Sequence, residues 1–282
     1  MEFQLLTMTK LPRVRQYPAI LVLSAVILAG CQKVVSVDLN QSNPQVVIEG
    51  VITDHPGPYT VTVEKTGDYF TPGLTFPPVA DATVVVTDNA GTVDTLRHTT
   101  GGTYQSTRLA GAPGRTYMLK VTAEGKEYDA MSSMPFRVRI DTLYTTPLVE
   151  FDGDRGYNIM VVFTDPPGTP NWYRIEAHTT TVAADSLNGR QFILFRDNFT
   201  NGAQTTFRIR AARRVHAGDT LTVRLCSIDK ATYDYYRTVN DVIQSDRSPL
   251  SVAPGNPSSN ITNGSLGYFT AYAVDSATVI LP

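Results

Sequence analysis

The chain has 282 residues, of which 42% are hydrophobic, and its formal net charge is −2. This length is enough for two modest domains, and this apolar content is enough to build their cores. A net charge so close to zero excludes the broad basic field with which proteins bind nucleic acid or anionic lipid.

The N-terminus has the pattern of an export signal. Lys10, Arg13 and Arg15 form a basic region, and the short apolar run 19–29 follows it. Small residues then precede a thiol in Leu28-Ala29-Gly30-Cys31. A basic region, a short apolar core and small residues before a cleavage point are typical of secreted proteins.

The end of this signal resembles the lipobox of bacterial lipoproteins. The resemblance implies that residues 1–30 are removed and that Cys31 carries a palmitate-type diacylglycerol anchor. Because each buried methylene contributes about 0.8 kcal/mol, two or three acyl chains hold a domain at a membrane without a spanning helix. The alternative is an uncleaved transmembrane anchor. Against it, the uncharged run 16–32 is at the short end of the roughly 20 residues that a spanning helix needs.

The residue after Cys31 bears on the cell compartment. Lipoproteins retained in the inner membrane have an aspartate there, whereas this chain has Gln32, so the resemblance implies an outer-membrane lipoprotein of the cell envelope. Periplasmic and surface-facing orientations both stay open.

The one other cysteine is Cys226. A lipidated Cys31 therefore leaves no intramolecular disulfide, and burial must stabilise the fold.

The rest of the chain alternates apolar and polar residues as strands do. Apolar side chains occupy every second position in the runs 59–64, 117–122 and 221–225. Turn-forming Gly, Pro, Asn and Asp separate such runs at spacings of about ten residues. We therefore expect a mainly β fold of two β-sandwich-like units, at 45–134 and 135–282, after a tether at 31–44.

The same pattern places the individual elements. Strands are expected at 46–53, 59–65, 83–87, 93–98, 102–106, 116–123, 126–132, 138–143, 158–164, 172–178, 192–195, 205–210, 221–228, 268–273 and 278–281. One amphipathic helix is expected at 230–244 in the second unit, with Asp229 available as its N-cap. Its Tyr233, Tyr235 and Tyr236 are expected to pack on a sheet, and a sugar or peptide platform is the alternative.

Four runs of the first unit carry a family resemblance: Ile48–Asp54, Ala80–Val86, Gly102–Tyr104 and Gly114–Val121. They resemble the carboxypeptidase regulatory-like sandwich, a prealbumin-type, Ig-like module that lies beside outer-membrane receptors and secreted enzymes without catalysing reactions. The stretch 67–78 is longer than in that pattern. It is either a mere insertion or a binding loop, whose contact residues would be Asp68, Tyr69, Phe70 and Phe76.

Further runs resemble a wider family over nearly the whole mature chain: 44–50, 66–70, 226–229 and 259–272. This family is the Bacteroidetes lipoproteins known by the domain of unknown function 4249. Its members typically accompany TonB-dependent outer-membrane transporters. The resemblance therefore implies an accessory role in nutrient capture, with no known catalysis.

The residues predict a protein that is not an enzyme. The run 227–230 has the S-x-x-K spacing of serine acyl-transferases, and Lys65-Thr66-Gly67 is a K-T-G. In those enzymes, however, K-T-G follows S-x-x-K, and a helical domain surrounds the serine. Cys226 lies in a strand-like run without a nearby histidine, so we expect a buried structural thiol.

Metal and cofactor sites are not predicted either. The histidines, which are His55, His98, His178 and His216, form no pair at ligand spacing. The acidic run 150–156 places carboxylates at alternate positions, but its glycine is displaced and Val161 stands where a calcium loop has glutamate. A solvated acidic turn is the expectation, with a calcium site as the alternative.

Five triplets of aspartate, a hydroxyl residue and an aliphatic residue resemble the acceptor of Bacteroidetes envelope O-glycosylation. Their hydroxyl residues are Thr95, Thr142, Ser186, Thr220 and Ser276. The same triplet is also found where a turn leads into a strand. Modification and a structural role therefore both stay open.

Two functions follow as expectations. The first is a membrane-tethered, non-enzymatic accessory lipoprotein that binds, caps or stabilises a TonB-dependent receptor of the outer membrane. The second is an independent surface module for glycan, peptide or matrix, with aromatic contacts such as Tyr69, Phe70, Trp172 and Tyr173. Nucleic acid is not an expected partner, and the transported substrate cannot be derived from these residues.

Overall fold

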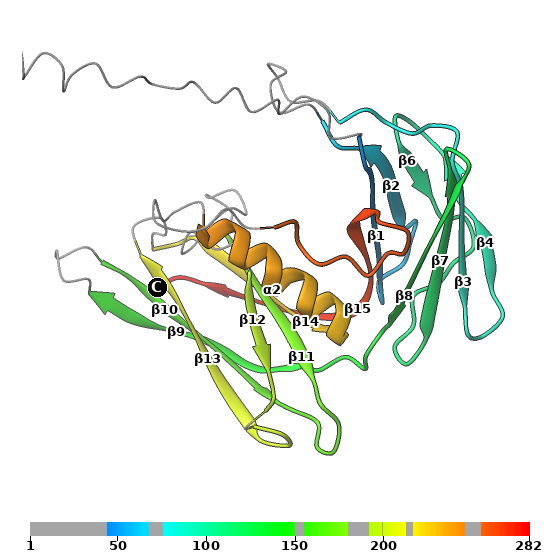
Figure 1. Ribbon diagram of the computed structural model, residues 1–282. Coiled ribbons are helices and arrows are strands. Elements are labelled where there is room, and N and C mark those ends of the chain that lie inside the picture. The colour runs from blue at the N-terminus through cyan, green and yellow to red at the C-terminus, as the bar shows by residue number, and fades with distance from the viewer. Residues whose placement is uncertain are drawn as a thin grey trace, which may run out of the picture. The chain divides into compact units, whose positions relative to one another are not determined.

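The computed structural model describes residues 44–67, 76–149, 155–179, 192–198, 200–212, 217–245 and 255–282. The predictions for Cys31, Asp68, Tyr69, Phe70 and Ser186, and those for the acidic residues 150–154, therefore lie outside the described residues. Within the described residues the fold is mainly β with sandwich-like packing of sheets, as predicted (Figure 1).

The first half of the described chain consists of strands. Their bounds are β1 (Val46–Thr53), β2 (Thr60–Lys65), β3 (Thr83–Asp88), β4 (Val93–Thr95), β5 (Arg97–His98), β6 (Thr103–Gln105), β7 (Thr116–Ala123) and β8 (Lys126–Ser133). β7 buries Tyr117, Leu119 and Val121 and exposes Met118 and Lys120 between them. A period of two is what a strand with one buried face requires.

The second half adds strands and one described helix. Their bounds are β9 (Ile140–Val149), β10 (Arg155–Thr164), β11 (Trp172–Thr179), β12 (Ile193–Arg196), β13 (Gln204–Ala212), β14 (Thr220–Ile228), α2 (Lys230–Ser245) and β15 (Leu266–Ile280). The helix lies close to its predicted position.

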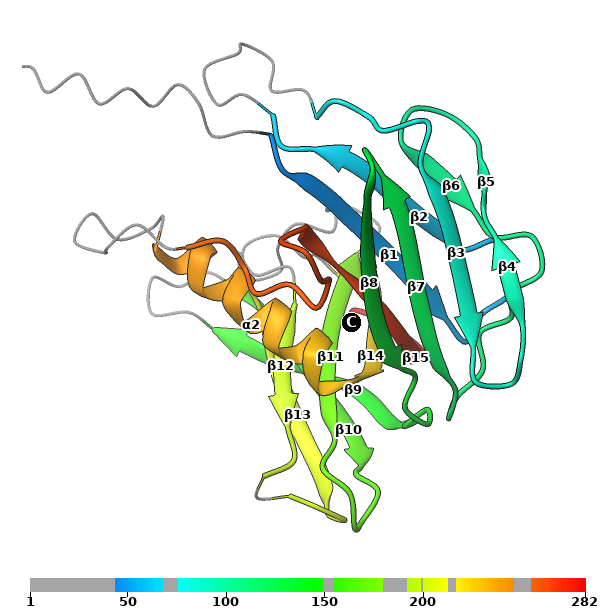
Figure 2. The same cartoon turned by 45° about the vertical axis from the view of Figure 1, so that its right-hand side comes forward.

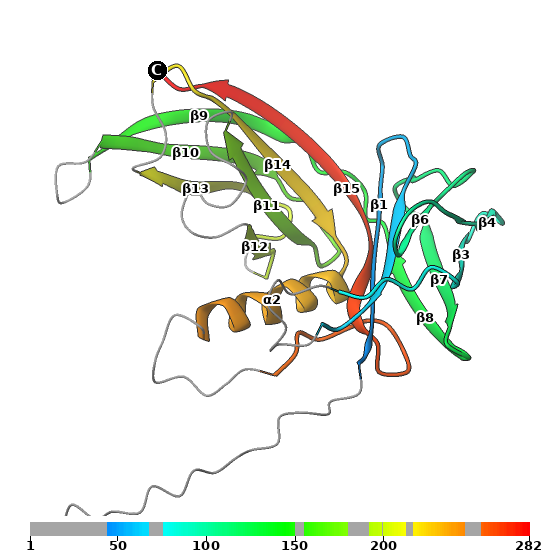
Figure 3. The ribbon, with the colours of Figure 1, turned by 90° about the horizontal axis from the view of Figure 1, so that it is seen from above.

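Strand β15 joins strands from both halves in one sheet. Its first part, Leu266–Tyr272, pairs in parallel with β1, and its second part, Ala273–Ile280, pairs antiparallel with β14. The sheet order is β12-β11-β14-β15-β1-β2-β6-β5. Figure 3 shows β15 between β14 and β1. The prediction of two separate strands here is wrong, because the middle of β15 is buried on both faces and alternation therefore lapses.

Two smaller sheets complete the sandwiches, and each encloses a hydrophobic core. The sheet β4-β3-β7-β8 shares a core with β1, β2 and the first part of β15, where Ile48, Tyr117 and Phe269 are buried. The sheet β13-β10-β9 shares a second core with β11 and β14, where Phe163 and Val223 are buried. The first core thus takes residues from the C-terminal strand as well as from the first half.

Asp229 connects the two halves at the start of α2. Its Oδ1 accepts the N–H of Thr232 at 2.8 Å, which confirms the predicted N-cap. Its Oδ2 accepts the hydroxyl of Ser132 at 2.6 Å and the N–H of Ser133 at 3.0 Å. The Ser132 oxygen in turn accepts the N–H of Ala271 in β15 at 2.8 Å. One carboxylate therefore links β8, α2 and β15.

A second carboxylate, that of Asp54, makes a similar connection after β1. Its side chain is 2% exposed and lies 2.7 Å from Arg137 Nη2. It also accepts the N–H of Val274 in β15 at 3.0 Å. The segment between the predicted units is thus bound to β15 through one buried charge.

The predicted strand at 93–98 is two strands in different sheets. β4 pairs with β3, whereas β5 pairs with β6. Leu96 lies between them and is buried. The chain changes sheets at this residue, because its side chain enters the core between the two layers.

Candidate functional site

The tyrosine-rich helix α2 packs on the eight-stranded sheet (Figure 3). Tyr235 stacks on Tyr268 of β15 with the ring centroids 4.3 Å apart. The Tyr236 hydroxyl donates to the Tyr268 hydroxyl at 2.7 Å. Below the first turn, the hydroxyl oxygens of Thr232 and Thr270 lie 2.8 Å apart. These contacts agree with the expected packing role of the helix.

Tyr235, Tyr236, Tyr268 and Tyr272 form a tyrosine cluster, and a buried arginine lies between two of its rings. Arg174 of β11 is 5% exposed, and its Cζ lies 4.4 Å from the Tyr236 ring centroid and 5.0 Å from that of Tyr272. Its Nη2 lies 2.8 Å from Glu176 Oε1. A buried charge needs such pairing, and the electron-rich ring faces add to it.

Burial favours the neutral forms of Cys226 and Tyr235, which lie near Arg174 and its tyrosine neighbours. It raises the pKa of the Cys226 thiol to about 11, although the Arg174 charge opposes this rise. Burial, with the nearby Glu49 charge, raises the pKa of Tyr235 to about 12. Cys226 is fully buried and makes no disulfide, so it is the structural thiol that its strand predicted.

The residues of the acyl-transferase-like pattern have separate partners. The Ser227 oxygen accepts the N–H of Val138 at 3.3 Å. Lys230 pairs with Asp234 on α2, and Lys65 pairs with Glu124. Among the described residues, no hydrogen bond joins Ser227 to either lysine.

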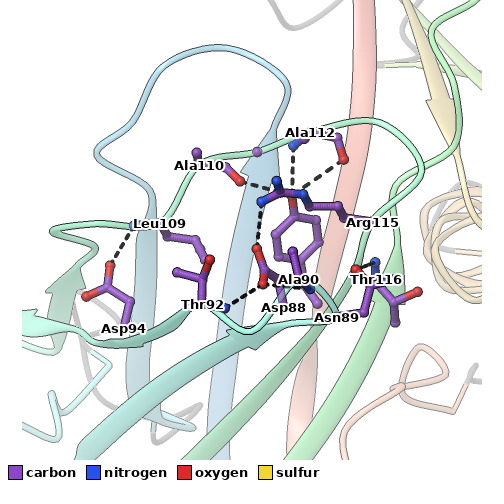
Figure 4. Close-up of polar contacts among 12 residues, drawn as sticks. Asp88, Asn89, Ala90, Thr92, Asp94, Leu109, Ala110, Ala112, Arg115 and Thr116 are labelled. Carbon is purple, nitrogen blue, oxygen red and sulfur yellow. Dashed lines mark hydrogen bonds and ion pairs between the residues drawn. The ribbon is translucent and has the colours of Figure 1, made fainter.

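Asp94 has a structural role in the first of the possible glycosylation triplets (Figure 4). Its buried carboxylate accepts the N–H groups of Thr107 and Arg108 at 2.8 Å and that of Leu109 at 3.0 Å. The Thr107 hydroxyl donates to it as well, at 2.8 Å. These bonds fix the loop between β6 and β7. Thr95, the next residue, is exposed.

Two other triplets also have an engaged aspartate. Asp141 accepts the Thr164 hydroxyl at 2.7 Å, and Asp275 accepts the N–H of Ile140 at 2.8 Å. The hydroxyl residues that follow, Thr142 and Ser276, are exposed, whereas Thr220 is half-buried. A structural cause thus explains the aspartates, and modification of the hydroxyls stays a prediction.

The described residues include one member of the possible binding loop and no group of side chains suited to bind a metal ion. Phe76, the described member of the loop set, is 49% exposed. His55, His98 and His178 lie on different elements, and no three His, Cys, Asp or Glu side chains of the described ranges are grouped as metal ligands. No helix in the described part of the chain is long and apolar enough to span a membrane.

A groove lies on the outer face of the sheet β4-β3-β7-β8, which Figure 2 shows turned toward the viewer. Its volume is about 520 Å³. Strands β3, β7 and β8 and the segment before β15 line it, with the residues Val85, Thr87, Met118, Leu119, Lys120, Asp129, Ala130, Met131, Asn260 and Thr262. Sequence reasoning did not find this site.

One row of side chains crosses the groove and all four strands. Strand pairing aligns Val93, Thr87, Met118 and Met131 in order, and we call them the methionine row. Val93 is 55% exposed, Met118 47% and Met131 61%. Met118 and Met131 are direct neighbours in this row, and adjacent exposed apolar side chains mark contact surfaces more often than scattered ones do.

The segment before β15 closes one side of the groove. Thr262 exchanges two hydrogen bonds with Asp129, each 2.9 Å long, through its N–H and its side-chain oxygen. Asn260 donates to the Met131 carbonyl at 3.3 Å. The edge of β8 is therefore covered along these residues, which leaves the face of the sheet rather than its edge for contact.

A signal for the groove was present in the sequence. Met118 stands between Tyr117 and Leu119, so the period of two already places a methionine on the outer face of β7. Met131 has the same position on β8. Strand register aligns these two methionines with Val93 in one row. The alternation of apolar and polar residues does not predict this register.

Comparisons with known proteins place the chain in a family. A family model described as "Domain of unknown function (DUF4249)" matches residues 32–278. No curated protein matches. One solved structure, a beta-glucuronidase 3 of Bacteroides uniformis without ligand, matches with a TM-score of 0.20 and 13% identity. The match covers 65% of this chain and 23% of that chain, and so carries no argument about fold or activity.

Proposed function

We propose that this chain, which belongs to the DUF4249 family, is a membrane-tethered, non-enzymatic accessory lipoprotein of a TonB-dependent outer-membrane transporter. The lipobox-like ending at Cys31 supports the tether. The resemblance to Bacteroidetes lipoproteins supports the outer-membrane location and the partner. A prealbumin-type character of the N-terminal sandwich belongs to the same proposal, and it rests on the four runs of residues that resemble such modules.

The methionine row is the observation that carries this proposal. Methionine side chains adapt to irregular apolar partners, and an exposed apolar row loses water when a partner covers it. We assign the groove to an apolar loop of the transporter. Residues 31–43 extend at most about 45 Å, so a lipidated Cys31 would restrict the groove to partners at the membrane.

The tether also lowers the affinity that the groove itself needs. Two proteins confined to one membrane meet at a high effective concentration, so a modest apolar contact is enough to hold them together. The proposed function therefore requires both the anchor and the groove, and each can be removed separately.

The test is co-purification from membranes that contain the native transporter set. The tagged full-length chain is cross-linked, extracted in detergent and captured, and mass spectrometry quantifies any large outer-membrane barrel. Met118→Lys combined with Met131→Lys is expected to reduce the captured barrel at least tenfold. Both side chains are exposed, so the fold should persist.

The matched control changes the same sheet face outside the groove. Thr83 and Thr122 are exposed partners on β3 and β7, and Thr83→Lys with Thr122→Lys should leave capture unchanged. Equal capture by both double variants would remove the groove from the proposal. Repeated recovery of the wild-type chain without a barrel would instead favour the independent binding module.

A further inference from the structure

A polar strip crosses the eight-stranded sheet beside the tyrosine cluster. Two successive rows of paired residues on β11, β14 and β15 form it: Glu176, Arg224 and Ser276, then His178, Thr222 and Thr278. The hydroxyl oxygens of Thr222 and Thr278 lie 3.1 Å apart. This strip is separate from the groove, which lies on another sheet.

Two arginines, Arg224 of the polar strip and Arg174 beside it, share one carboxylate, that of Glu176. Glu176 Oε1 lies 2.8 Å from Arg174 Nη2, while its Oε2 lies 3.2 Å from Arg224 Nη1 and 3.6 Å from His178 Nε2. Within the described residues, these are the ion pairs of all four side chains. Among the described residues, this one carboxylate thus pairs with both guanidinium groups, so the two arginines and Glu176 together carry an excess of one positive charge.

The excess charge is partly open to solvent. The side chain of Arg224 is 34% exposed and that of His178 is 33% exposed, whereas Arg174 is 6% exposed. Within the described residues, Arg224 contacts Glu176 through Nη1, which leaves its Nε and Nη2 groups outside this ion pair. Ser276, the neighbour of Arg224 on β15, is exposed as well.

We infer that the polar strip binds an oxyanion, with a carboxylate group as the best match. The planar guanidinium of Arg224 offers parallel N–H donors that suit the two oxygens of a carboxylate. His178 and the hydroxyl of Ser276 add donors on either side. Arg174, two residues before Glu176 on the same face of β11, adds positive charge but stays between the rings of Tyr236 and Tyr272. The inference does not depend on the proposed accessory function.

The test measures stabilisation of the full chain in detergent by anions. The midpoint of thermal unfolding is followed against sodium acetate and sodium sulfate, with sodium chloride keeping the ionic strength constant. A bound anion stabilises the folded state in a saturable way. Acetate should raise the midpoint above the chloride reference, and Arg224→Gln should raise the half-saturating acetate concentration about tenfold or more.

Two further variants test whether the effect is specific to Arg224 and whether it depends on the shape of its side chain. Arg208→Gln removes an exposed arginine from β13 and should leave the acetate response unchanged. Arg224→Lys keeps the charge without the planar fork and should also weaken acetate, which separates geometry from charge should Arg224→Gln unfold. Sulfate stabilisation without acetate stabilisation would overturn the carboxylate assignment. Equal responses of the wild type and both Arg224 variants would overturn the site.

Discussion

Buried aspartates hold the loops of the N-terminal sandwich. Asp88 accepts the N–H groups of Ala90 at 3.0 Å and Thr92 at 2.8 Å and pairs with Arg115 at 2.8 Å (Figure 4). Asp94 accepts four hydrogen bonds from the loop after β6. A carboxylate that accepts several N–H groups replaces its lost hydration, which is why a charge is tolerated at these buried positions.

The first prediction concerns Asp94 and its neighbour Thr95. Asp94→Ala leaves the buried N–H group of Leu109 and the part-buried N–H groups of Thr107 and Arg108 without their acceptor, so the free energy of unfolding should fall by about 3 kcal/mol. Thr95→Ala removes an exposed hydroxyl and should change stability by less than about 0.5 kcal/mol. Urea denaturation of the two variants measures both values. If Thr95 is glycosylated, Thr95→Ala should lose the glycan mass while stability persists. Asp94→Ala also removes the aspartate of the acceptor triplet and should lose both the glycan mass and stability.

The same carboxylate makes stability depend on pH. Burial alone would raise the pKa of Asp94, but the hydrogen bonds from Arg108, Thr107 and Leu109 outweigh it and leave this pKa below its ordinary value. Its stabilisation is therefore complete above the unfolded pKa, near about 4, and is lost as pH falls through the folded pKa. The stability gap between wild type and Asp94→Ala should accordingly shrink below about pH 4.

At the scale of elements, β15 depends on one glycine. Gly267 has a φ of +88°, and a Cβ atom there would lie 2.1 Å from the carbonyl oxygen of Ile48 in the paired strand β1. A side chain would therefore require both a strained backbone and separation of the parallel strands.

The second prediction compares two glycines before and within β15. Gly267→Ala should cost more than about 3 kcal/mol, because the contact with the Ile48 carbonyl cannot relax without loss of strand pairing. Gly264→Ala is the control, since Gly264 has a φ of +75° and open space around its Cα. It should cost about 1 kcal/mol, from backbone strain alone. Similar losses at both positions would contradict the importance of this close approach.

The elements show how far pattern reasoning extends. Strand β7 and the helix with its Asp229 cap were predictable, because period and capping chemistry are local. The break at Leu96 was not, since β4 and β5 take partners in different sheets. The methionine row and the polar strip could not be predicted either, for the same reason. Their members lie on separate strands, and register decides which of them are neighbours.

At the scale of the whole molecule, the N-terminal sandwich is completed by the C-terminal strand. Its core contains Phe269, Ala271 and Ala273 of β15 together with Ile261. Asp54 and Asp229 add hydrogen bonds between the halves. The boundary near residue 134 stays a prediction, but the first core does not consist of residues 45–134 alone.

The third prediction concerns cooperativity. A fragment of residues 44–135 should fail to fold, because it leaves an unpaired edge on β1 and lacks the core residues of β15. The chain from residue 44 to 282 should unfold in one transition. Circular dichroism and Trp172 fluorescence should give coincident midpoints. A folded fragment, or separate midpoints, would show that the two cores are independent.

The sequence by itself determined what depends on neighbours in the chain: the mainly β character, the helix at 230–244 and the buried thiol of Cys226. It also predicts the lipobox-like signal at Cys31. Local period, charge and turn chemistry specify these features without long-range contacts. Only the tertiary structure decided that β15 unites β1 with β14, that Met118 and Met131 share a groove with Val85, and that Arg224 and His178 share Glu176. Strand pairing between distant segments creates these sites, and no local pattern encodes which strands will pair.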